Sequence, residues 1–66
     1  MATTTESIFH VDGHTYAGGF LTASFETEEA ALAFWGADSD WQDGAVVEEI
    51  FEPTKRSYRE LRRVGF

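Results

Sequence analysis

Two histidines separated by three residues, His10-Val-Asp-Gly-His14, are the first side chains in the chain whose types suit metal binding or acid–base chemistry. The same stretch contains Asp12-Gly13, the strongest short signal for a two-residue hairpin turn. Pairing across such a turn places the imidazoles of His10 and His14 on opposite faces of the ribbon. Because a zinc site needs three or four converging ligands, we predict no metal here and assign Asp12 to the turn.

A second candidate is Asp38-x-Asp40 with Glu49 eleven positions after the first aspartate. This spacing resembles the calcium loop of EF-hand proteins at positions one, three and twelve, and it implies a calcium-binding loop over residues 38–49. The fifth and sixth loop positions hold Gln42-Asp43, where the family has Asp or Asn followed by the glycine of the sharp turn. A strand-like segment follows instead of a helix, so the competing interpretation is a solvated acidic loop.

Other catalytic patterns are weak. No spacing joins a serine, a histidine and an acid into a triad, and Gly18-Gly19 lacks the further glycine, lysine and helix start of a phosphate loop. A core this small rarely supports a dry, preorganised cleft. We therefore predict that the protein is not an enzyme and needs no cofactor.

The basic residues form one short segment. The first 53 residues contain no Lys or Arg and hold eleven of the twelve acidic residues. The arginines of the basic segment are Arg56, Arg59, Arg62 and Arg63. They could contact nucleic-acid phosphates, but the field of the acidic remainder repels phosphate. The favoured expectation is pairing within the chain, with Arg56 or Arg59 near the carboxylates of Glu49 or Glu52.

The acidic excess, −7 at pH 7 in 66 residues, favours a basic protein partner. Small acidic proteins that mimic nucleic acid or fill a basic groove work in this way. Aromatic anchors surrounded by charge are typical of protein interfaces, and both tryptophans stand among acidic residues. The partner-binding residues that we predict are Trp35, Trp41, Glu28, Asp38, Asp40 and Asp43.

The composition also bears on assembly and location. Ten aromatic residues compete for the core of a 66-residue chain, which buries only about 60% of its unfolded surface, so we expect a homodimer that seals an apolar patch. The absence of cysteine is typical of a cytoplasmic protein. Since no apolar run approaches 18 residues and the start is not basic and then apolar, we expect neither a membrane span nor a signal peptide.

The elements that must position these residues belong to one small α+β domain, residues 1–66, with residues 1–5 frayed. Residues 7–11 alternate as a strand, and residues 14–25 form the return strand of an N-terminal hairpin. We expect a bulge at Gly18-Gly19 that brings Leu21, Ala23 and Phe25 to the core face. A second tight turn at the two glycines is the alternative.

A helix is expected over residues 28–36, packed across a small antiparallel sheet. Thr27 is its N-cap, and Gly36 ends it. Its buried stripe contains Ala31, Phe34 and Trp35. A further strand covers residues 45–52, bounded by Gly44 and Pro53.

The C-terminal segment, residues 57–64, supports two interpretations. Ser57-x-x-Glu60 matches a capping box, which favours a helix. Folding back onto the preceding strand sets Glu49 opposite Arg59 and Val47 opposite Leu61, which favours a pairing strand. Both remain open at this level.

Overall fold

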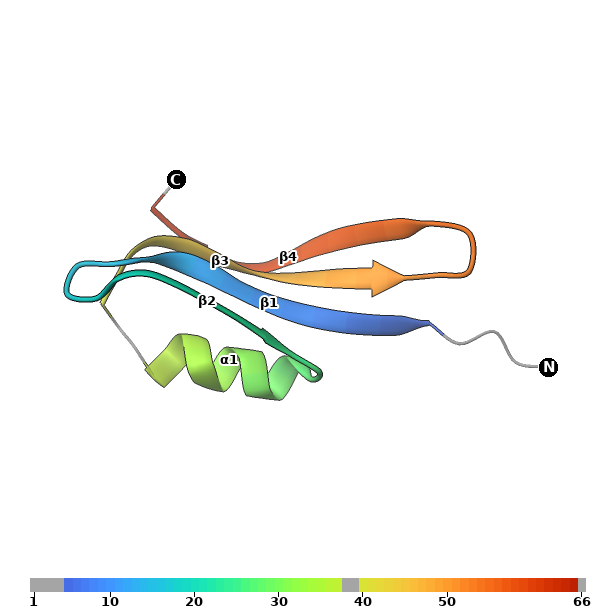
Figure 1. Cartoon of the computed structure of the whole chain (residues 1–66), viewed down its shortest axis with the longest axis horizontal. Helices are drawn as coiled ribbons and strands as arrows, with labels where there is room; N and C mark the ends of the chain where they lie inside the picture. The colour runs from blue at the N-terminus through green and yellow to red at the C-terminus, as the bar shows by residue number, and fades with distance from the viewer. Residues whose placement is uncertain (1–4, 38–39, 66) are drawn as a thin grey trace.

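The computed structural model describes residues 5–37 and 40–65 (Figure 1). They form a four-stranded antiparallel sheet and one helix, which confirms the α+β class. The elements, in chain order, are β1 (Glu6–Thr15), β2 (Gly19–Phe25), α1 (Glu28–Ala37), β3 (Trp41–Phe51) and β4 (Arg56–Val64). Of the segment predicted to be frayed, residues 1–4 lie outside the described residues. No helix in the described part is long and apolar enough to cross a membrane.

The strands lie side by side in the order β2-β1-β3-β4, so β2 and β4 are the two edges of the sheet. Because β2 and β3 both run antiparallel to β1, the connection through α1 must cross over β1. The helix therefore packs against β1, β2 and β3 on one face of the sheet (Figure 1). We call the opposite face the open face.

The core lies between α1 and the middle of the sheet. Its buried residues are Phe9 and Val11 of β1, Val46 of β3 and Ala31 of α1. Alternation along β1 turns Phe9 and Val11 to the helix, while His10 between them faces away. The margin of this core contains the half-buried Phe25, Leu32, Phe34, Trp35, Trp41 and Leu61. Four buried side chains make a very small core, so most aromatic rings in the described part keep exposed area.

The first hairpin differs from the prediction. Asp12-Gly13 lies inside β1, and the turn comes three residues later, between Thr15 and Gly19. The expected bulge at Gly18-Gly19 is also wrong, because Gly19 opens β2 with a positive φ of 75° and the β1–β2 register is regular. The turn between Thr15 and Gly19 nevertheless brings the same side chains of β2 to the helix side of the sheet as the predicted bulge would have brought. Leu21, Ala23 and Phe25 are half-buried, as predicted.

Gly13 is required by its neighbours in the sheet. It pairs with Gly44 of β3, and a Cβ at Gly13 would lie 2.8 Å from the Cα of Gly44 and 2.9 Å from Cε3 of Trp41. A Cβ at Gly44 would lie 3.3 Å from Cζ3 of Trp35. The two glycines thus leave a flat backbone on which the tryptophans pack. Trp35 and Trp41 stack with ring centroids 4.5 Å apart and planes 16° apart.

The helix is the element that the sequence predicted best. It spans Glu28–Ala37, one residue longer than expected at its C-terminal end. Thr27 is its N-cap, since Thr27 Oγ1 accepts a hydrogen bond of 3.1 Å from the backbone N–H of Ala30. Ala31 is fully buried, and Phe34 lies against Phe25 with ring centroids 5.4 Å apart. These contacts fix α1 over the sheet.

The C-terminal segment is a strand, so the helix suggested by Ser57-x-x-Glu60 does not form. β4 pairs with β3, which begins at Trp41 rather than at residue 45. The register is one residue away from the predicted pairing: Glu49 faces Tyr58 and Glu48 faces Arg59. A register shift between Val46 and Val47 leaves Leu61 as the extra residue of β4. Long-range pairing outweighs the local capping signal here.

Candidate functional site

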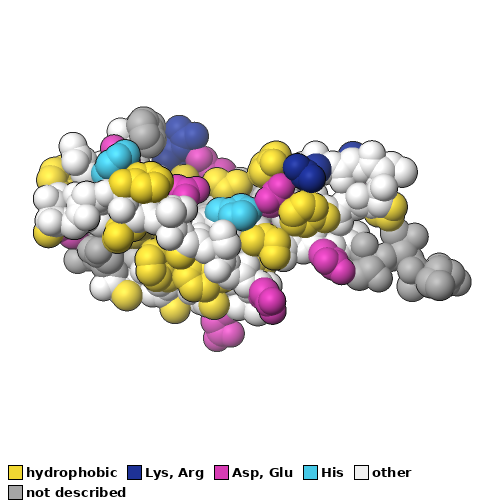
Figure 2. Space-filling view, in the orientation of Figure 1, with side chains coloured by type: hydrophobic (Ala, Val, Ile, Leu, Met, Phe, Trp, Pro, Cys, Tyr) yellow, Lys and Arg dark blue, Asp and Glu magenta, His cyan; other side chains and the backbone are white. Residues whose placement is uncertain are grey.

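The open face carries an unusual mixture of polar, acidic and apolar side chains. Its residues are Phe20, Thr22 and Ser24 of β2, Glu6, Ile8, His10, Asp12 and His14 of β1, Asp43, Ala45, Val47, Glu49 and Phe51 of β3, and Arg56, Tyr58, Glu60 and Arg63 of β4. Figure 2 shows both histidines on one side of the molecule, with hydrophobic side chains beside them. Phe20 and Tyr58 are 57% and 62% exposed. An uncovered sheet face is usually more polar than this.

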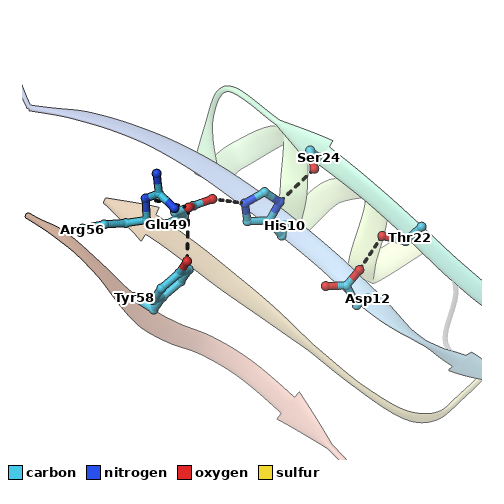
Figure 3. A network of polar contacts seen from close by, with 7 residues as sticks. All are labelled: His10, Asp12, Thr22, Ser24, Glu49, Arg56 and Tyr58. Atoms are coloured by element: carbon cyan, nitrogen blue, oxygen red, sulfur yellow. Dashed lines mark hydrogen bonds and ion pairs between the residues drawn. The ribbon is translucent and has the colours of Figure 1, made fainter. Parts of the chain in front are cut away.

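A hydrogen-bonded row crosses the open face from β2 to β3 (Figure 3). His10 lies at its centre, with Nδ1 2.8 Å from the Ser24 hydroxyl and Nε2 2.8 Å from Oε1 of Glu49. When Nε2 carries the proton, it donates to Glu49 and Nδ1 accepts from Ser24. Alternation along β1, β2 and β3 brings these three side chains to one face. The row therefore ties three strands together at one level of the sheet.

Glu49 extends the row to β4. The Tyr58 hydroxyl donates to Oε2 of Glu49 at 3.2 Å, and Nε of Arg56 lies 3.4 Å from the same oxygen (Figure 3). The hydrogen bond from His10 lowers the pKa of Glu49 most. The hydrogen bond from Tyr58 and the charge of Arg56 lower it further, and burial opposes them. The carboxylate is thus held ionised by partners on both sides of β3.

Ser24, His10 and Glu49 together have the order of a nucleophile, a base and an orienting acid. No spacing in the sequence indicates this combination, because the three residues come from three strands and only the sheet register joins them. Serine hydrolysis also needs oxyanion donors and a sheltered site for the reacting carbonyl. Ser24 is exposed, and it does not line the hollow described below. The row is best explained as a brace across the sheet.

A similar brace lies on the helix side, beyond the end of the core. Glu48 is nearly buried, and its carboxylate accepts a hydrogen bond of 2.7 Å from the Ser7 hydroxyl. Its other oxygen accepts bonds of 3.0 and 2.7 Å from Nε and Nη2 of Arg59. The Ser7 hydroxyl first, and then Arg59, lower the pKa of Glu48, although burial opposes them. This contact joins β1, β3 and β4.

The open face has a shallow, solvent-open hollow of about 250 Å³ near the β1–β2 turn. Its lining residues are Asp12, Gly13, His14, Phe20, Asp43, Gly44 and Ala45. The glycines and the alanine form a floor with little or no side chain, while two carboxylates and an aromatic ring stand at the rim. The ring of Phe20 lies 5.1 Å from that of His14, whose Nδ1 is 2.9 Å from Oδ1 of Asp43.

The predicted arrangement of the histidines is wrong. Both lie on β1 and on the open face, because β1 continues through Asp12-Gly13. Four residues of strand separate them by about 13 Å, and each is bonded to a different carboxylate. No group of three or more potential metal-ligating side chains occurs within residues 5–37 and 40–65.

The predicted partner-binding residues do not form one patch. Trp41 Nε1 donates to the backbone oxygen of Trp35 at 2.9 Å, so the tryptophans form a pair packed on the core. The carboxylate of Asp40 accepts from the N–H of Ala17 at 2.9 Å and supports the β1–β2 turn. Asp43 stands at the rim of the hollow. The other two predicted residues are Glu28, which is exposed in the first turn of α1, and Asp38, which lies outside the described residues.

The described part of the predicted calcium loop, residues 40–49, does not have the geometry of such a loop. Residues 41–49 belong to β3, and alternation along a strand sends successive side chains to opposite faces. Asp40 and Glu49 are nine residues apart, a separation of about 30 Å in an extended chain. Carboxylates so far apart cannot share one ion.

The arginines lie along β4, at the edge of the sheet. Arg56 pairs with Glu49 at 3.4 Å and Arg59 with Glu48 at 2.7 Å. This confirms that the basic segment pairs with the preceding acidic strand, although Arg59 takes Glu48 rather than Glu49. The other two arginines contact residues of β4 itself. Arg63 pairs with Glu60 at 2.6 Å, and Arg62 donates to the backbone oxygen of Leu61. Much of the basic charge is thus neutralised within the chain.

Acid is expected to weaken the sheet through Glu48 and Glu49. Both carboxyl groups have pKa values below the ordinary 4.5, so each stabilises the folded state fully above pH 4.5 and loses that effect as the pH falls through its lower folded value. We expect the urea midpoint to fall between pH 5 and pH 3, and to fall less steeply in Glu49→Gln. Urea titrations followed by circular dichroism at each pH test this. The matched control is Glu26→Gln, an exposed position in the β2–α1 connection, which should keep the wild-type slope.

Comparison with known proteins gives no relative: no family model matches the chain, no curated protein matches it, and no solved structure matches it.

Proposed function

We propose that this protein is a non-enzymatic interaction module, working as a dimer, that binds a basic surface of another protein through its open face. The observation that carries the proposal is the hollow beside the β1–β2 turn. Its lining surface is almost wholly apolar, with a floor of backbone and Ala45, and Asp12 and Asp43 are among its lining residues. Oδ1 of Asp12 accepts a hydrogen bond from the Thr22 hydroxyl and Oδ1 of Asp43 lies 2.9 Å from His14, so each carboxylate has its second oxygen for a partner. An arginine or lysine of a partner could lay its apolar stem along such a floor and its charge between the two carboxylates.

The surroundings of the hollow fit the same kind of partner. Phe20 is 57% exposed at its rim, and an aromatic ring adds a cation–π contact to a bound guanidinium or ammonium. The wider open face offers further exposed aromatic area at Tyr58, which is 62% exposed. The net charge of −7 would steer a basic partner toward this surface and would speed association at low salt.

Nucleic acid ranks below a basic protein as the partner. Three of the four arginines on β4 are bound to carboxylates of β3 or β4, which repel phosphate. The same contacts explain why β4 stays docked on the acidic sheet. A protein with a net negative charge is attracted electrostatically to a basic protein and repelled by a polyanion such as nucleic acid.

The proposal is tested by neutralising the rim of the hollow. A lysate of the source organism is passed over the immobilised protein at low salt, the captured protein is identified, and its affinity is measured by calorimetry. Asp12→Asn with Asp43→Asn should weaken binding about tenfold or more, because two charged contacts are lost. Glu26→Gln with Glu29→Gln removes the same charge at the start of α1 and should change the affinity by less than about threefold. Failure to capture any protein, or equal losses in the two double variants, would contradict the proposed site.

A further inference from the structure

The two edges of the sheet are very different. β4 carries the charged residues Arg56, Arg59, Glu60, Arg62 and Arg63 among its nine positions, and its pairing is interrupted by a register shift. Charges and bulges of this kind prevent an edge strand from pairing with other chains. β2, residues Gly19–Phe25, contains no charged residue and no proline, and its pairing with β1 runs without a shift from Thr15↔Gly19 to Phe9↔Phe25. Within residues 5–37 and 40–65, no such charge, proline or bulge protects the β2 edge.

Such an edge presents backbone N–H and C=O groups that a further strand can bind. Its side chains also define the strand that would fit. Leu21, Ala23 and Phe25 point to the helix side and are half-buried, whereas Phe20, Thr22 and Ser24 are exposed on the open face. An added strand would therefore need apolar residues on the helix side and small polar residues on the open face.

We infer that β2 is the dimer edge and that its occupant is β2 of a second copy, in antiparallel two-fold pairing centred on Thr22. In this register Thr22 faces its own copy, and Leu21 faces Ala23 of the second molecule. On the helix side, Leu21 then faces Ala23, and on the open face threonine faces threonine at the axis while Phe20 faces Ser24 on either side of it. The result is one eight-stranded sheet with both helices on the same face.

Electrostatic repulsion between two copies is weakest at the β2 edge, because β2 is the strand without charged residues. Two copies, each with a net charge of −7, repel one another, and each of the other three strands carries at least two charged residues. Pairing along β2 brings no carboxylate of one strand opposite a carboxylate of the other. A seven-residue edge is nevertheless a small interface, so we expect dissociation on dilution through roughly 1–100 µM. This inference rests on the proposed function and specifies its dimer; the dimer edge adjoins the hollow, because Phe20 at the rim belongs to β2.

Because the chain has no cysteine, one introduced thiol can report on the edge. Residues facing each other across an antiparallel pair have Cα atoms about 4.5–5.5 Å apart, within the range that a disulfide spans. Thr22→Cys should therefore form a disulfide-linked dimer under mild oxidation at least tenfold faster than Thr54→Cys, whose thiol lies in the exposed β3–β4 connection. Equal rates for the two variants would overturn the inference.

Sedimentation equilibrium provides the second test. The wild-type protein should change from twice 7.4 kDa to 7.4 kDa on dilution, and Thr22→Lys should be monomeric at all concentrations because two lysines would face each other across the axis. Thr54→Lys should dimerise like the wild type. Circular dichroism checks that Thr22→Lys is folded, which we expect because Thr22 is exposed and faces Asp12. A 7.4 kDa wild-type particle throughout, or a dimer unaffected by Thr22→Lys, would refute the β2 edge, and neither result would bear on partner binding at the hollow.

Discussion

Replacing Gly13 with alanine is expected to lower the free energy of unfolding by about 2–4 kcal/mol, one of the two largest effects of a single substitution in this protein. The new Cβ would meet the backbone oxygen of Asp43 and would lie 2.8 Å from the Cα of Gly44. Both are backbone atoms of β3, so no side-chain rotation relieves the clash. β1 and β3 would have to separate at the centre of the sheet.

This loss is large for the protein, because the core of a domain of this size rarely supplies more than about 3–5 kcal/mol of folding stability. We expect Gly13→Ala to be largely unfolded at 25 °C, and urea titration followed by circular dichroism measures the effect. Gly36→Ala is the matched control: a Cβ there has no neighbour within 4 Å, and the residue lies in α1, where alanine gains up to about 1 kcal/mol over glycine. A melting temperature for Gly13→Ala within two or three degrees of the wild type would contradict the close approach of the two strands.

Gly13 also illustrates why the sequence misplaced the first hairpin. Asp-Gly is a strong local turn signal, because both residues tolerate positive φ. In the structure Gly13 is needed for its lack of a side chain, and the neighbour that requires this is Gly44, 31 positions later in the chain. A local pattern cannot distinguish these two uses of glycine. Two errors followed from this one: the position of the turn, and the separation of His10 from His14.

The features that could be predicted are those determined within a few residues. The N-cap at Thr27, the run of helix-forming residues after it and the buried Ala31 all act inside α1, and the structure confirms them. The class of the fold follows from the same local signals. Contact of the basic segment with the acidic strand was also predictable, because acidic residues precede Pro53 and basic residues follow it, although helix and strand both remained open for the segment.

The candidate site could not be predicted, because each of its contacts joins different strands. Ser24, His10 and Glu49 become neighbours only through the order β2-β1-β3. The hollow likewise depends on Asp12 and Asp43, which are 31 positions apart and come together because β1 pairs with β3. Asp43 was selected from the sequence as a partner-binding residue, but its neighbours at the rim were not.

The second large effect is expected at Trp41, where alanine should lower the free energy of unfolding by about 2–4 kcal/mol. The indole stacks on Trp35 at 4.5 Å and donates a hydrogen bond of 2.9 Å to the Trp35 backbone oxygen, which lies near the end of α1. Carbonyls in the last turn of a helix lack an intrahelical partner, so this bond satisfies one of them. Trp41 therefore joins α1 to β3 above Gly13 and Gly44.

Trp41→Phe separates the two contributions, because phenylalanine keeps a stacked ring but cannot donate the hydrogen bond. We expect it to lose about 1 kcal/mol, well short of the alanine variant. Thermal melts and near-ultraviolet circular dichroism, which reports on the packing of the two tryptophans, measure both variants. If Trp41→Ala instead keeps wild-type stability and loses only its partner, Trp41 is an interface anchor, as the sequence suggested. If it unfolds, a loss of binding in Trp41→Ala says nothing about the interface, and the exposed rim residue Phe20 becomes the position at which an aromatic contact can be tested without disturbing the core.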